Sequence, residues 1–288
     1  MKVGVVGASG LIGGAVLTAL EQNGHQWVGF SRSTAGRKGE WRTLQDGLSG
    51  LDAIVNLAGD SIDKRWTDEN KKRFYESRVG VTEDIVAALK ELPASERPGI
   101  LVNASAVGYY GDQADTVLTE AADQGTGYLA ELCEQWEAAA EKAKALGLRV
   151  VLGRIGVVLA SQASAWQRMK PVFSIGIGGK LGSGKQYWPI VHVDDITGAI
   201  LHILTQDAIS GPVNLVGQTT VTNTEFTQSL GQLLSRPTIF SVPAFALKLV
   251  FGGFGDALLA SYRVEAEVLQ KSGYSFKYPT LAKLLSAL

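Results

Sequence analysis

The feature that most constrains this chain is a short apolar run followed by three evenly spaced glycines. Residues 3–6 are typical of a buried strand, and residues 11–22 carry apolar side chains at helical spacing. Gly7, Gly10 and Gly13 therefore lie in a strand-to-helix turn, where they permit a tight turn, the close approach of a pyrophosphate and close packing of the helix on the strand. Free backbone N–H groups and the positive helix end would face the anion. The motif predicts a nucleotide site; the alternative is a turn that is merely rich in glycine.

Strands and helices alternate along the first part of the chain. The expected strands cover residues 26–31, 51–57, 100–105 and 148–155, and the expected helices cover residues 68–92 and 128–146. This alternation predicts an α/β fold in which a Rossmann-type, doubly wound parallel sheet is covered by helices on both faces.

The pattern is looser after about residue 160. A glycine-rich loop spans residues 174–185, and a late strand and helix are expected at 213–216 and 223–234. We expect residues 1–160 to form a nucleotide-binding Rossmann domain and residues 161–288 to form a smaller C-terminal lobe, from which some segments return to the sheet. Ligands of such sheets bind outside the carboxyl ends of the strands, so this lobe would cover the substrate.

The second expected strand indicates which nucleotide binds. NAD sites usually carry an acidic residue there, about 20 residues after the glycines, that bonds the ribose 2′-hydroxyl. Here the strand ends in Phe30-Ser31-Arg32, without an acid, and a guanidinium beside a hydroxyl suits a 2′-phosphate. Arg37 and Lys38 add positive charge nearby. The sequence therefore predicts NADP(H) as the cofactor; a solvated arginine in a loop is the alternative.

Composition and charge exclude several classes of function. The 27 basic and 28 acidic residues leave a net charge of −1, which gives no electrostatic reason to expect nucleic acid or an anionic membrane as the main partner. The single cysteine, Cys133, cannot form an internal disulfide or a cysteine-based zinc site, and the three histidines show no metal-ligand spacing. No apolar run reaches the ~18 residues of a membrane helix, and glycines interrupt the N-terminal run, unlike in a signal peptide. We expect a cytoplasmic monomer or homodimer with a small-molecule substrate.

Several longer motifs carry a resemblance to a known family. They are GASGLIGG at 7–14, FSRS at 30–33, VNLAGDSIDKRW at 55–66, SRV at 77–79, SAVGYYGD at 105–112, LCEQWE at 132–137, RIGVVL at 154–159, LGSGKQYWPIVHVDD at 181–195 and GYSFKYPTL at 273–281. Co-linear over nearly the whole chain, they resemble the extended short-chain dehydrogenase/reductases and, more closely, an atypical branch, the SDR39U1-like epimerase-family proteins, also labelled SulA. The resemblance implies a Rossmann domain, bound NADP(H) and an unassigned oxidoreductase or epimerase-type activity.

Cofactor contacts are expected from several places in the chain. Leu57-Ala58-Gly59 ends one strand with small residues that let the backbone approach a ribose or ring, unless it is a plain strand-to-loop turn. The resemblance further implies that two arginines and a valine approach the nucleotide; surface charge and sheet core are the alternatives for them. The full set of expected cofactor-binding residues is Gly7, Ser9, Gly10, Leu11, Ile12, Gly13, Ser31, Arg32, Leu57, Ala58, Gly59, Arg73, Arg78 and Val157.

The catalytic residues of that superfamily are incomplete here. Its chemistry uses a Tyr, a Lys four residues later on the same helical face that lowers the Tyr pKa, and a Ser or Thr. Tyr128 stands in a suitable position, but Leu132 replaces the Lys and supplies no charge. Ser105 occupies the Ser position only after a shift of one residue, since an alignment without that shift places Ala106 there. Tyr110 could supply a phenol from another direction, or be a packing residue.

Other polar residues have structural as well as catalytic interpretations. His192 would be a general acid if it faced the cleft, but the apolar helical run after it favours a structural histidine, with Asp194 as the helix cap. The loop at 176–185, which ends in Lys185, could close over substrate or bind an anion, or could simply supply left-handed turns. Cys133 is expected to be a buried, inert thiol.

Two hypotheses about function follow from these residues. The first is an NADP(H)-dependent oxidoreductase or epimerase that acts on a small polar or nucleotide-linked substrate. The second is a non-catalytic NADP(H)-binding sensor or scaffold that has lost the Tyr-x-x-x-Lys chemistry. The missing lysine favours the sensor, whereas the retained glycine-rich loop and polar residues favour the enzyme. Resemblance of fold alone cannot decide between them.

Overall fold

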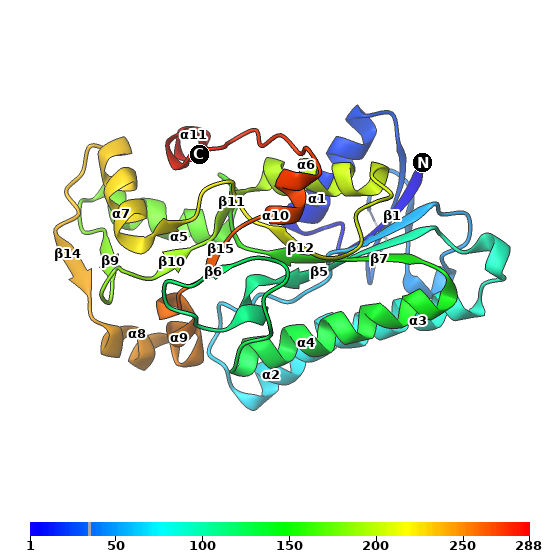
Figure 1. The fold of residues 1–288 in the computed structure, drawn as a ribbon, viewed down its shortest axis with the longest axis horizontal. Coiled ribbons are helices and arrows are strands. Elements are labelled where there is room, and N and C mark those ends of the chain that lie inside the picture. The colour runs from blue at the N-terminus through cyan, green and yellow to red at the C-terminus, as the bar shows by residue number, and fades with distance from the viewer. Residues whose placement is uncertain (34–35) are drawn as a thin grey trace.

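A seven-stranded parallel sheet forms the centre of the molecule (Figure 1). The structure is a computed structural model that describes residues 1–33 and 36–288. The strand order is β12-β7-β5-β4-β1-β2-β3, and every neighbouring pair is parallel. The strands are β1 (Lys2–Val6), β2 (Gln26–Phe30), β3 (Trp41–Arg42), β4 (Ala53–Asn56), β5 (Ile100–Ala106), β7 (Arg149–Ile155) and β12 (Gly211–Leu215). This order and direction confirm the predicted Rossmann-type α/β fold.

Helices cover both faces of the sheet, as Figure 1 shows. On one face lie α2 (Asp68–Tyr75), α3 (Val81–Glu91) and α4 (Tyr128–Glu141), and on the other lie α1 (Leu11–Gln22) and α6 (Val193–Thr205). Each helix buries an apolar stripe: Val16 and Ile200 pack with Val5 on one side, and Ile85 packs with Ile54 on the other. Because both faces are covered, the central strands are almost continuously apolar.

The predicted helix over 68–92 is present but interrupted. Residues Glu76–Gly80 form a π-helical turn between α2 and α3, so the helix widens there to hold one extra residue in the turn. The predicted helix over 128–146 likewise changes its winding, from α-helix up to Glu141 to a 3₁₀ turn over Lys142–Leu146.

The C-terminal half consists of short elements beside the sheet. Its strands pair two by two, some with strands of the first half: β8 (Val157–Leu159) with β11 (Ile190–His192), β10 (Tyr187–Trp188) with β13 (Val221–Thr222), β9 (Gly179–Leu181) with β14 (Phe240–Val242), and β6 (Val117–Leu118) with β15 (Arg263–Val264). Its remaining helices are α5 (Ser164–Ser174), α7 (Asn223–Leu233), α8 (Ala244–Phe251), α9 (Gly253–Leu259), α10 (Glu267–Lys271) and α11 (Leu281–Ser286).

The late strand does return to the sheet. β12 pairs with β7, and α6, which precedes β12, packs against α1. The division at about residue 160 stays a prediction about domains, but elements from beyond it are built into the sheet. Across the described ranges 1–33 and 36–288, no helix combines the length and the apolar character needed to cross a bilayer.

Candidate functional site

The glycine turn forms a cradle made of backbone. Gly7 has φ +77°, and a Cβ on Gly13 would lie 2.3 Å from the Gly7 carbonyl oxygen, so only glycine permits this contact between α1 and the end of β1. Gly10 precedes α1, and no side chain caps the first N–H groups of that helix. Ser9 and Leu11 are exposed beside it. Uncapped N–H groups at a helix N-terminus form an anion site, so these residues fit a pyrophosphate.

The loop after β4 lies against this cradle. The Leu57 N–H donates to the Val6 carbonyl oxygen over 2.9 Å, and a Cβ on Gly7 would lie 2.7 Å from the Leu57 carbonyl oxygen. The Ala58 N–H donates to Asn56 Oδ1, which holds the loop in place. β1 and β4 are adjacent strands at which the order of the sheet reverses, and ligands of such sheets bind in the crevice at that point.

The two arginines predicted to approach the nucleotide, Arg73 and Arg78, both contact Asp60 in the loop after β4. Arg78 Nη2 donates to the Asp60 carbonyl oxygen over 2.9 Å, and Arg73 Nη2 lies 3.0 Å from Asp60 Oδ2. A Cβ on Gly59 would lie 3.3 Å from Arg78 Cζ. The π-helical turn contains Ser77 and Arg78; Ser77 Oγ accepts the Asp60 N–H at 3.0 Å. The extra residue in the helix therefore orients two side chains that fix the loop.

At the end of β2, the structure describes Arg32 and also Arg37, one of the two further basic residues expected nearby. Arg32 is exposed, and Ser31 Oγ accepts a hydrogen bond from Arg37 Nη2 at 3.3 Å. The Arg37 guanidinium carbon lies 4.4 Å from the centre of the Trp41 ring, a cation–π distance. The arrangement places a hydroxyl and guanidinium groups, and no carboxylate, directly after the strand.

Two of the three predicted catalytic hydroxyls are used inside the protein. Ser105 is buried, and its Oγ donates to Glu137 Oε1 over 2.6 Å. Tyr110 has no exposed surface; its hydroxyl donates to Asn214 Oδ1 at 2.7 Å and accepts from Arg154 Nη1 at 3.0 Å. Both hydroxyls are therefore bonded to groups inside the protein in this structure, and a catalytic role for them stays a prediction.

A buried ion pair holds this group together. Arg154 donates through Nε and Nη2 to the two carboxylate oxygens of Glu137, each over 2.9 Å, and its Cζ lies 3.5 Å from the centre of the Tyr109 ring. Glu137 raises the pKa of Arg154 despite its burial, so the guanidinium stays charged. Sequence reasoning missed this pair. The sequence did carry a signal for it: an arginine stands inside an apolar strand, and a glutamate stands on the apolar side of a helix. Burial of either charge without a partner would cost too much free energy, so the two were candidates for a pair.

Tyr128 is the predicted catalytic residue with a partly exposed phenol. It is the first residue of α4, its ring centre lies 5.2 Å from that of Trp66, and Lys71 Nζ lies 5.0 Å from its ring centre. Its hydroxyl faces the Lys71 carbonyl oxygen at 3.4 Å. Burial raises the pKa of Tyr128, and the charge of Arg78 opposes that rise. Leu132, which stands where the superfamily carries its lysine, is buried.

The remaining sequence interpretations have different outcomes. Val157 lies just beyond β7, half-buried and paired with Ile190. The loop at 176–185 contains β9. Three of its glycines, Gly176, Gly182 and Gly184, have positive φ, whereas Gly178 does not. Burial raises the pKa of Cys133 to about 11, as expected for an inert thiol.

The prediction for Asp194 was wrong. His192 is itself the cap of α6, because its Nδ1 accepts the Asp194 N–H at 3.1 Å. Asp194 instead binds Lys277 Nζ at 2.7 Å, and Asp195 accepts the N–H groups of Lys277 and Tyr278. The motifs at 181–195 and 273–281 are therefore parts of one structure that fastens the C-terminal tail.

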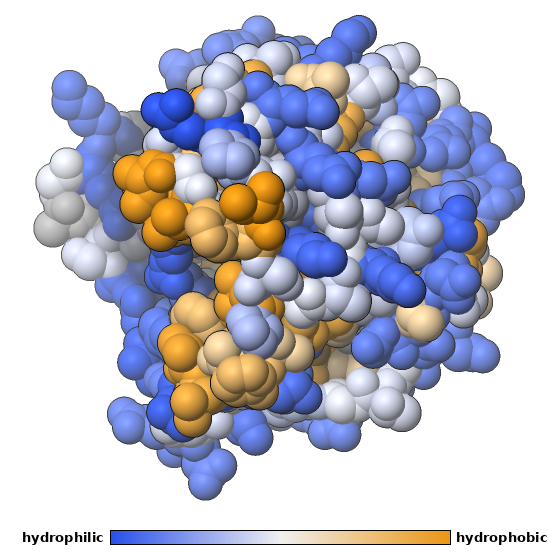
Figure 2. Space-filling model, turned by 90° about the vertical axis from the view of Figure 1, so that its left-hand side faces the viewer, coloured by the Kyte–Doolittle hydropathy of each residue, from blue (hydrophilic) through white to orange (hydrophobic). Residues whose placement is uncertain are grey.

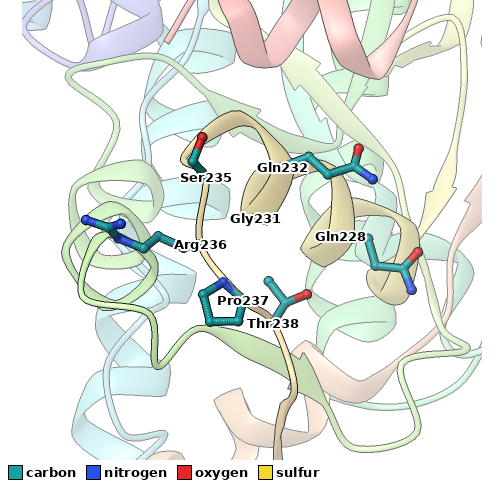
Figure 3. A pocket seen from close by; sticks show the side chains of 7 residues that line it. All are labelled: Gln228, Gly231, Gln232, Ser235, Arg236, Pro237 and Thr238. Carbon is teal, nitrogen blue, oxygen red and sulfur yellow. The ribbon is translucent and has the colours of Figure 1, made fainter.

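A shallow depression of about 580 Å³ lies away from the sheet edge, on α7 and the segment after it. Figure 3 shows its lining residues, Gln228, Gly231, Gln232, Ser235, Arg236, Pro237 and Thr238. It brings together none of the predicted site residues. Among the residues that the structure describes, no three His, Cys, Asp or Glu side chains are placed to hold a metal ion.

The fold and the backbone cradle define a dinucleotide-binding Rossmann protein of the extended short-chain dehydrogenase/reductase type. Residues 3–216 match the NAD dependent epimerase/dehydratase family, and residues 242–288 match a domain of unknown function, DUF1731. The chain belongs to the NAD dependent epimerase/dehydratase family and is an SDR39U1-like member of it.

Full-length relatives agree with this assignment. Epimerase family protein ML0860 of Mycobacterium leprae is 37% identical over 99% of this chain and 94% of its own length. The chloroplastic SDR39U1 homolog of Arabidopsis thaliana is 36% identical over 100% of this chain and 86% of its own. The crystal structure of human SDR39U1 (isoform 2) with NADPH superposes with a TM-score of 0.91 at 30% identity, covering 99% of this chain and 98% of that one.

Proposed function

We propose that this protein binds NADP(H) and uses it as an oxidoreductase or epimerase-like enzyme on a small polar or nucleotide-linked substrate. The observation that carries the proposal is the backbone cradle at residues 7–13, which meets the loop after β4 and has a hydroxyl and arginines, but no carboxylate, at the end of β2. The similar human protein that was crystallised with NADPH supports the same cofactor.

The cofactor would lie along the carboxyl edge of the sheet. Its pyrophosphate would contact Ser9 to Gly13, its 2′-phosphate would contact Ser31 and Arg32, and the remainder would pass Leu57 to Gly59 toward Val157. Arg73 and Arg78 would act at the loop after Gly59, to which they are already bound. Bound NADPH supplies a hydride.

Tyr128 would supply the proton. Because burial raises its pKa, the phenol is neutral at physiological pH and can donate a proton to a substrate oxygen. Lys71 and Arg78 place positive charge around the ring, where it would stabilise the phenolate left after proton transfer. In this role the phenol serves the reduction of a carbonyl, and the reverse oxidation would use the same group, ionised, as the base.

The cofactor proposal is tested by calorimetric titration with NADPH and with NADH. We expect NADPH to bind at least about tenfold more tightly, the size of a charge-assisted hydrogen bond to the extra phosphate. Arg32→Asp should remove that preference, whereas Lys90→Asp, on α3, should keep it. Equal affinities in the unaltered protein would refute the NADP(H) preference.

The enzyme proposal is tested by following NADPH absorbance with a panel of carbonyl compounds and sugar nucleotides. Tyr128→Phe should lower turnover by about a hundredfold or more, because a general acid is lost, while Tyr75→Phe on the exposed side of α2 should not. The sensor is the second candidate, favoured by the buried Leu132 where the superfamily carries a lysine. Tight NADPH binding without turnover across the panel would select it.

A further inference from the structure

Residues 175–177 and 239–250, which are distant in the sequence from the predicted catalytic residues, form an unusually apolar part of the surface. Figure 2 shows two neighbouring groups of apolar side chains on the side of the molecule that carries β9, β14 and α8. Six side chains with exposures between 53% and 82% define what we call the apolar face: Ile175, Ile177, Ile239, Phe245, Leu249 and Val250. Exposed apolar groups gathered on one side of a protein mark an interaction surface.

Local contacts hold the segments of the apolar face together. Gly179 pairs with Phe240 across β9 and β14, and Arg236 Nε donates to the Ser174 carbonyl oxygen at 2.6 Å, so the turn at 175–177 lies beside the segment that enters β14. Helix α8 follows β14 after a single proline. The apolar face is therefore one surface built from two stretches of chain.

Helix α8 presents its apolar residues outward. Leu247 is buried, and α9 approaches so closely that a Cβ on Gly255 would lie 2.6 Å from the Leu247 carbonyl oxygen. With Leu247 fixed inward, Phe245 and Leu249, four residues apart, stand side by side on the outer side, each 73% exposed. An anchored helix that exposes large apolar side chains is the arrangement by which proteins insert shallowly into a lipid interface.

The charge of these two stretches identifies the partner. Residues 164–185 and 226–255 contain six basic residues and no acidic one, and two of the six, Arg168 and Lys248, are ion-paired with Asp63 and Asp256. Lys248 on α8 is ion-paired with Asp256 at 2.7 Å. Lys180 is paired opposite Ser241 in β14, and Arg236 lies beside the turn at 175–177. A second copy of the chain packed against this face would bring the same cations together, whereas an anionic surface complements them.

We propose that the apolar face docks onto the surface of a bilayer that contains anionic lipid. Phe245, Leu249 and Ile175 would enter the boundary between headgroups and acyl chains, while Lys180 and Arg236 contact the phosphates. The protein would lie on the membrane without crossing it. This proposal does not depend on the enzymatic function proposed above.

The experiment is co-sedimentation of the full chain with phosphatidylcholine vesicles, with and without phosphatidylglycerol. We expect binding to the anionic vesicles that weakens as salt is added. Phe245→Ser/Leu249→Ser should lower the partition coefficient at least about tenfold, because two large apolar side chains no longer enter the interface. Lys180→Gln and Arg236→Gln should each lower it about fivefold on anionic vesicles.

A matched control and a second measurement decide the outcome. Val117→Ser removes an exposed apolar side chain on β6, outside the apolar face, and should bind as the unaltered protein does; thermal unfolding followed by circular dichroism verifies that each variant is folded. The proposal is overturned if the protein stays in the supernatant with anionic vesicles, or if the double variant still binds. It is also overturned if light scattering finds a dimer that the double variant dissociates, since a second copy then occupies the face.

Discussion

At the scale of single residues, the charged pair between Arg154 and Glu137 is the most consequential feature of the interior. It joins β7 to α4, and through Ser105 and the Tyr110 hydroxyl it reaches β5 and the turn that follows. Each polar atom of the ion pair has a partner inside the protein. Removal of one charge would leave the other buried and uncompensated, which is far more costly than removal of both.

Glu137→Ala is therefore expected to lower the free energy of unfolding by about 3–5 kcal/mol. The double variant Glu137→Leu/Arg154→Met replaces the pair with apolar groups and should recover most of that loss. Urea-induced unfolding of the two variants and the unaltered protein measures the difference. A single variant that loses less than the double variant would contradict this account.

His192 makes stability depend on pH. Burial lowers the pKa of His192 below its ordinary 6.5, against the charges of Asp194 and Asp195. The unfolded chain therefore binds the proton first, so the stability contributed by the neutral ring is complete above pH 6.5 and is lost as the pH falls below it. His192→Asn keeps a side chain that can cap α6 but does not titrate. Its unfolding free energy should fall less steeply below pH 6.5 than that of the unaltered protein; equal slopes would refute the assignment.

The role of a residue was predictable from the sequence only where it depends on the residue's own position in a helix or strand, and not on a distant partner. Cys133 falls among apolar residues on its helix and is buried as expected. The partners of Ser105 and Tyr110 were not predictable, because Glu137 and Asn214 lie 32 and 104 residues away. Which of two nearby polar residues caps a helix also depends on backbone angles, so the prediction of Asp194 in place of His192 was wrong.

At the scale of elements, the packing of α1 on β1 depends on one glycine and not on its neighbour. A Cβ on Gly13 would lie 2.3 Å from the Gly7 carbonyl oxygen, whereas a Cβ on Gly14 would meet nothing closer than 3.9 Å. Gly13→Ala should cost about 1–3 kcal/mol of stability and weaken NADPH binding, because the helix must move off the cradle. Gly14→Ala should stabilise the helix by about 0.5–1 kcal/mol and leave binding unchanged. Chemical denaturation and calorimetry compare the two; similar effects would contradict the close contact.

Element types were predictable because the pattern of apolar residues has a clear period in the first half of the chain. Strands at 26–30, 53–56, 100–106 and 149–155 lie within a residue or two of their predicted bounds. The π-helical turn at 76–80 was not predictable, because nothing in the periodicity of residues 68–91 distinguishes one extra residue from a continuous helix. The pairing of short strands in the C-terminal half depends on tertiary contacts that local sequence does not contain.

At the scale of the whole molecule, the sheet is completed by residues from both halves of the chain. A fragment of residues 1–160 would expose the edge of β7 that β12 covers and the side of α1 that α6 covers. We expect this fragment to lack a cooperative thermal transition by circular dichroism, in contrast to the full chain, because a sheet face and an edge are left open. Cooperative melting of the fragment would show that residues 1–160 are an independent domain.

The distribution of charge over the whole molecule is more informative than the net charge of the chain. The overall balance of −1 gave no reason to expect an anionic surface as a partner. Acidic residues are nevertheless absent from residues 164–185 and 226–255, which carry six basic ones. A sum over the chain hides such a distribution, and only the fold shows that both stretches border the same side.

The placement of β12 beside β7 also bears on how the protein is made. Synthesis proceeds from the N-terminus, so the cradle at residues 7–13 leaves the ribosome early. β12, the strand that closes the sheet, follows β7 only after about fifty further residues. At ordinary rates of synthesis the nascent chain spends several seconds with an uncovered apolar edge. Chaperones that shield that edge should therefore raise the yield of soluble protein in cells that overproduce this chain, more than added cofactor does.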